Sequence, residues 1–94
     1  MHPLELIFEK AVEQATKGKG DERHGNGKDF MKQPWVDLAK IHGTGFLTGQ
    51  AHKKLMEAVS NREETSYLWY ERELLGAMVY LAMALLYERE MTND

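Results

Sequence analysis

The fold of this chain is decided by one stretch, Leu74-Leu75-Gly76-Ala77-Met78-Val79-Tyr80-Leu81-Ala82-Met83-Ala84-Leu85-Leu86-Tyr87. These residues carry no charge and are apolar on every face of a helix, which predicts a helix buried on all sides. The stretch is too short to span a bilayer, which takes about 20 residues. The rest of a 94-residue chain can hardly cover such a helix. We therefore expect a homo-oligomer in which Leu74–Tyr87 packs against another copy.

Three shorter helices are predicted upstream. In residues 3–16 the apolar side chains recur at helical spacing, as Leu4, Phe8, Ala11, Val12 and Ala15. Pro34 opens a second helix to Ile41, and a third runs from the Thr44 cap to about Val59. A single bent helix from Pro34 to Val59 is the alternative.

The long C-terminal helix is expected to begin at Ser60-Asn61-Arg62-Glu63, which has the form of a capping box, and to run to about Met91. A restart at Thr65-Ser66 is the other interpretation. No strand-like alternation occurs along the chain. The expected fold is therefore all-α: a compact, oligomeric bundle of about four helices with a long buried C-terminal helix, forming a single domain over residues 1–94.

Charge is distributed unevenly around a formal net charge of −3. Residues 17–32 and residues 33–56 each sum to +2, whereas residues 57–94 sum to −5. This basic excess is weaker than nucleic-acid-binding domains usually show, so duplex DNA or RNA is not an expected partner. Without a signal-peptide pattern or a membrane-spanning run, we expect a cytoplasmic protein with no membrane partner.

Residues 17–33 are expected to form a flexible loop, because four glycines and dense charge leave little to bury. In a functional interpretation, Arg23 and Lys28 pair with phosphate and His24 donates a hydrogen bond. In the alternative interpretation the loop is a solvated turn. Trp35, just beyond it, could stack on a base or pack in the core.

A second glycine-rich segment follows, His42-Gly43-Thr44-Gly45-Phe46-Leu47-Thr48-Gly49-Gln50. Gly45 and Gly49 leave a flat groove on one helix face. That groove serves either a close helix–helix contact or an anion resting on the helix N-terminus. It is not a P-loop, because the Gly-Lys-Ser/Thr ending is missing. The predicted ligand-binding residues are Arg23, His24, Lys28, Trp35, His42, Thr44, Gly45, Thr48, Gln50 and Lys53.

Catalytic and metal sites find little support in the sequence. The chain has no cysteine, and its histidines do not follow zinc-ligand spacing. No serine nucleophile pattern is present. The paired carboxylates fit a solvated surface better than a Mg²⁺ site. No metal, cofactor or catalytic residue is predicted.

Residues 34–90 resemble the all-α nucleotide pyrophosphohydrolases of the MazG type. The stretches that carry the resemblance are Gly49-Gln50-Ala51-His52-Lys53-Lys54-Leu55-Met56-Glu57-Ala58 and Glu71-Arg72-Glu73-Leu74-Leu75-Gly76-Ala77-Met78-Val79-Tyr80-Leu81-Ala82. The resemblance implies a helical oligomer with some relation to nucleotides. The metal-binding acids of that family would fall on Gln50, Lys53, Glu73 and Gly76, so three of the four are missing here.

The leading functional hypothesis is therefore non-catalytic binding or sequestration of a phosphorylated small molecule, such as a nucleotide or a nucleotide-derived signal. Small helical phage proteins that sequester nucleotide immune signals are similar in size and character. One alternative is a MazG-like pyrophosphohydrolase with an atypical site that uses Glu57, Glu71 and Glu73. Another is a protein-interaction inhibitor that acts through the acidic C-terminal half.

Overall fold

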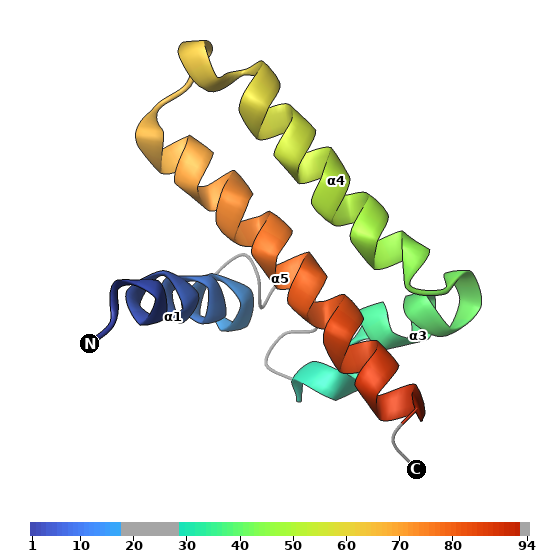
Figure 1. Ribbon diagram of the computed structural model, residues 1–94. Helices are drawn as coiled ribbons and strands as arrows, with labels where there is room; N and C mark the ends of the chain where they lie inside the picture. The colour runs from blue at the N-terminus through green and yellow to red at the C-terminus, as the bar shows by residue number, and fades with distance from the viewer. Residues whose placement is uncertain (18–28, 93–94) are drawn as a thin grey trace.

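The computed structural model describes residues 1–17 and 29–92, which form four α-helices and two short 3₁₀ turns (Figure 1). The elements are α1 (Pro3–Thr16), η1 (Phe30–Lys32), α3 (Pro34–His42), α4 (Gly45–Ser60), η2 (Arg62–Glu64) and α5 (Tyr67–Thr92). The predicted all-α fold of four helices is confirmed. Within the predicted loop 17–33, residues 30–32 instead form η1. No helix in the described ranges is long and apolar enough to cross a membrane.

Helices α4 and α5 form an antiparallel hairpin that is the backbone of the fold (Figure 1). The predicted start of α5 at Ser60 is wrong, because α4 continues through that residue. Asn61 then closes α4, with its Nδ2 donating to the Glu57 carbonyl at 2.9 Å. The alternative restart is confirmed: Ser66 Oγ accepts from the Trp69 amide at 3.2 Å and caps α5.

The core lies where α3 meets the lower part of this hairpin. Leu47 of α4 and Met83 of α5 are fully buried there, next to Trp35 at 2% exposure. Ala39 and Ala58 are also fully buried, and their small side chains let neighbouring helices approach closely. The glycine-rich segment therefore joins two helices that share one core, and the alternative of one bent helix from 34 to 59 is wrong.

Helix α1 lies against α5 on the side away from α4, and its N-terminus points away from the bundle (Figure 1). His2 caps it: Nδ1 accepts from the Leu4 amide at 3.0 Å. Only part of the predicted apolar stripe is used. Ala11 and Ala15 are buried, whereas Leu4, Phe8 and Val12 are more than half exposed.

Helix α5 is buried on some sides and open on another. Leu75, Ala77, Met83 and Ala84 are buried. Leu81, however, is 51% exposed and Leu85 74% exposed. The helix is thus not buried on all sides within one chain, because three shorter helices cover only the sides that face them.

Candidate functional site

The turn between α3 and α4 depends on Gly43. Its φ of 78° and ψ of 176° lie in a region that is open almost only to glycine. In this conformation the Gly43 amide donates to the Ala39 carbonyl at 2.7 Å and closes α3. Gly43 is therefore the residue that ends α3.

Thr44 stands at the N-cap of α4 but does not cap it with its side chain. Its hydroxyl donates instead to Glu88 Oε1 at 3.0 Å. The first amides of α4 are bonded within the turn, from Phe46 to the Gly43 carbonyl at 3.2 Å and from Leu47 to the Thr44 carbonyl at 2.9 Å. A carboxylate of α5 therefore already lies at the helix end where an anionic ligand was predicted, and the helix dipole favours it there.

Gly45 and Gly49 face outward from α4. A Cβ added at either residue would meet no heavy atom of the described chain within 4 Å. The interpretation of these glycines as a helix–helix contact is therefore wrong for contacts within the described chain. Leu47, Ala51 and Ala58 occupy the opposite, buried face of the same helix.

The other predicted residues of this segment surround α4 and do not converge on one point. Lys53 and Thr48 are exposed, on either side of Gly45 and Gly49, and Gln50 is half-buried. Thr48 Oγ1 bonds weakly to the Thr44 carbonyl at 3.4 Å. His42 is exposed, with its ring centroid 6.5 Å from that of Phe46. The arrangement is a flat helical surface with basic and hydroxyl groups at its edges. We call the surface made by Gly45, Gly49 and Lys53 the glycine face.

Trp35 belongs to the core and not to this surface. Its indole Nε1 donates to the Phe30 carbonyl at 2.9 Å, and the two rings are 5.5 Å apart. This position corresponds to the core-packing interpretation given above. Arg23, His24 and Lys28 lie outside the described residues.

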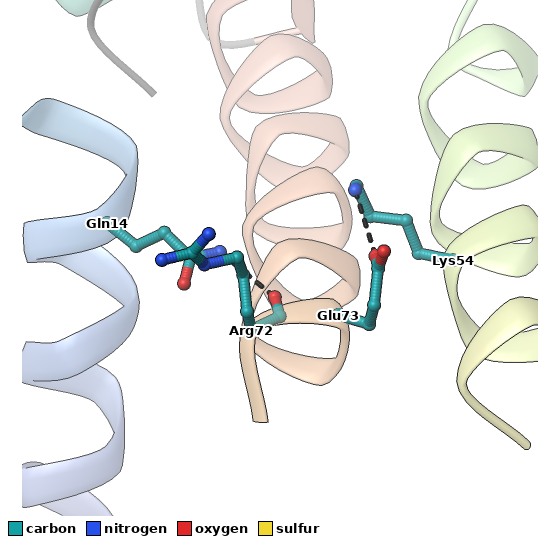
Figure 2. A network of polar contacts seen from close by, with 4 residues as sticks. All are labelled: Gln14, Lys54, Arg72 and Glu73. Atoms are coloured by element: carbon teal, nitrogen blue, oxygen red, sulfur yellow. Dashed lines mark hydrogen bonds and ion pairs between the residues drawn. The ribbon is translucent and has the colours of Figure 1, made fainter. Parts of the chain in front are cut away.

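A half-buried ion pair, which the sequence analysis does not predict, joins the middle of α4 to α5. Lys54 Nζ lies 3.1 Å from Glu73 Oε2, with the two side chains 20% and 14% exposed (Figure 2). The stem of Lys54 crosses Gly76, where an added Cβ would be 2.8 Å from Lys54 Cδ. No local pattern in the sequence indicates this contact, because it depends on which sides of α4 and α5 face each other.

Two of the three carboxylates that the pyrophosphohydrolase alternative would use, Glu71 and Glu73, are paired with lysines. Glu73 pairs with Lys54, and Glu71 Oε2 lies 3.5 Å from Lys10 Nζ on α1. Beside that second pair, Gln14 Nε2 donates to the Arg72 carbonyl at 3.0 Å (Figure 2). Within residues 1–17 and 29–92, no three His, Cys, Asp or Glu side chains are grouped as a metal ion would require.

A comparison with protein-family models, with curated proteins and with solved structures finds no match to this chain. The resemblance to the MazG type therefore rests on the residues quoted above and has no support from a family match. The arguments about function that follow depend on the geometry of the chain itself.

Proposed function

We propose that this chain is a binding protein that holds an external molecule on the glycine face of α4, and that this molecule is a phosphorylated small molecule such as a nucleotide. The observation that supports the proposal is the empty space around Gly49. A glycine inside a helix costs about 1 kcal/mol relative to alanine. No described residue lies within 4 Å of a Cβ built at Gly49, so there is room for an external molecule against this part of α4.

The groups around the glycine face suit phosphate. Lys53 supplies a mobile positive charge, and the missing side chains let oxygen atoms approach the backbone closely. Glu88 limits where such a group can lie, because its carboxylate repels a second negative charge near Thr44. We therefore place the phosphate between Gly49 and Lys53, away from the first turn of α4.

Titration calorimetry with mono-, di- and cyclic nucleotides tests this proposal. Gly49→Ala is expected to weaken binding although it stabilises the helix, so lost binding cannot be ascribed to lost folding. Lys53→Gln is expected to weaken it about tenfold, the effect of losing one charge-assisted hydrogen bond. Lys40→Gln, which removes an exposed lysine of α3 outside the face, is the matched control. Absence of heat with every nucleotide would refute the proposal.

A protein partner is the second candidate, favoured by the shape of the glycine face. Small-molecule sites are usually concave, whereas this face is the outer surface of a helix. Met56 and Val59, which are 50% and 60% exposed, extend α4 with further apolar surface. A helix of another protein, such as an enzyme that the chain inhibits, could lie across Gly45 and Gly49. Loss of a purified stoichiometric complex in Gly49→Leu, with no nucleotide binding by the wild type, would decide for this candidate.

A further inference from the structure

Helices α1 and α5 together expose a second apolar surface, separate from the glycine face. On α5, Leu81 and Leu85 are 51% and 74% exposed, and on α1, Leu4 and Phe8 are 59% and 55% exposed. An apolar groove of about 110 Å³ is lined by Phe8 of α1, by Met78 of α5 and by Phe30 of η1. We call this surface the α1–α5 face. Large contiguous apolar patches exposed on a protein surface mark interaction sites.

The spacing of the apolar residues along α5 indicates which molecule could bind to this face. Leu74, Met78, Leu81 and Leu85 follow one another at intervals of four, three and four residues, as in a coiled-coil seam. This order of intervals is the same in both chain directions. A second α5 running antiparallel therefore presents matching residues, with Leu74 opposite Leu85 and Met78 opposite Leu81. Such self-complementarity is what a twofold interface requires.

We propose that the α1–α5 face binds a second copy of this chain, with the two α5 helices antiparallel about a twofold axis between residues 79 and 80. Leu81 and Leu85, which are 51% and 74% exposed in one chain, would be covered by the α5 helix of the partner.

Charges at the two ends of the seam select the antiparallel direction. Arg89 follows Glu71 by 18 residues, which is five turns of about 3.6 residues, so both lie on the same side of α5. An antiparallel pair brings Glu71 of one copy beside Arg89 of the other, twice. In a parallel pair Glu71 of one copy and Arg89 of the other would lie at opposite ends of the seam, 18 residues apart, and could not pair.

Disulfide cross-linking tests the arrangement, because the chain has no cysteine of its own. Proteins carrying Leu74→Cys and Leu85→Cys are expected to form covalent dimers when mixed, and each alone is expected to form few. Leu55→Cys on α4, an exposed residue outside the face, is the control that stays uncross-linked with either. Cross-linking of each variant with itself, or equal yields for all three, would overturn the antiparallel dimer.

Light scattering provides the second measurement. The wild type is expected at twice the 10.8 kDa chain mass. Leu81→Glu should halve that mass and keep its helical circular dichroism, because Leu81 is already half exposed in a single chain. Leu55→Glu should remain a dimer. A wild-type mass of one chain at every concentration would refute the inference. It would leave the binding proposal for the glycine face untouched, since the two rest on different helices' surfaces.

Discussion

Gly49 on α4 and Gly76 on α5 both lie inside long helices, and their surroundings are opposite. A Cβ at Gly49 would meet no described atom within 4 Å, whereas one at Gly76 would lie 2.8 Å from Cδ and 3.0 Å from Cε of Lys54. The chain uses the missing side chain of Gly76 to let Lys54 reach Glu73. It makes no such use of Gly49. Glycines that look alike in the sequence thus serve packing in one helix and an outward surface in the other.

The largest effect is expected from the side of α4 opposite to Gly49. Leu47→Ala should lower the free energy of unfolding by about 2–5 kcal/mol, because a fully buried leucine leaves a cavity. Leu55→Ala, on the same helix but 45% exposed, should cost far less. Urea unfolding followed by circular dichroism measures both. Equal losses would mean that the inner and outer sides of α4 are wrongly assigned.

Gly43→Ala tests a glycine whose backbone conformation requires the absence of a side chain, in contrast to Gly49. The alanine variant must keep a φ near 78°, which costs about 1–3 kcal/mol. Space is not the reason, since no described atom lies within 4 Å of a Cβ there. A thermal melt should show a lower Tm. If the Tm were unchanged, the turn would have to tolerate another conformation.

Gly49→Ala is expected to act in the opposite direction. The new methyl group has open space, so the variant gains the helix propensity of alanine, about 1 kcal/mol. The same melt should therefore show a higher Tm. A lower Tm would reveal a contact that Gly49 makes within the folded protein. The claim that Gly49 faces open space would then be wrong.

Gly76→Ala should produce the smallest change. Its gain in helix propensity is of the same size, but the Cβ displaces the Lys54 stem and breaks the ion pair with Glu73. We expect the two effects roughly to cancel. In a Lys54→Ala background, where nothing is displaced, Gly76→Ala should stabilise by about 1 kcal/mol. Identical effects in the two backgrounds would show that Lys54 does not depend on this glycine.

Local signals in the sequence were sufficient for most of the helix bounds. Helix α1 begins and ends at the predicted residues, and α3 is one residue longer than predicted. Two starts of α5 are left open by the sequence, because Ser60 and Ser66 can each cap a helix. The choice between them depends on Asn61, which closes α4 through its side chain.

Contacts between residues far apart in the chain could not be predicted from the sequence. Thr44 is 44 residues away from Glu88, and nothing near either residue indicates that they meet. The pairing of Lys54 with Glu73 likewise depends on how α4 and α5 are set against each other. The predicted ligand residues on α4 lie on different sides of that helix. Which of these residues share one exposed side of α4 could not be predicted, because the sequence does not show which side of α4 is buried.

The direct succession of α4 and α5 has a consequence for how the chain folds. Only residues 61–66 separate the two helices, so their many contacts close a short loop. Short-range contacts of this kind form fast, because little chain entropy is lost before they are made. We expect the hairpin to form first and to offer α5 as a surface on which α1 docks later. Helix α1 would then also be the first element to detach when the protein unfolds.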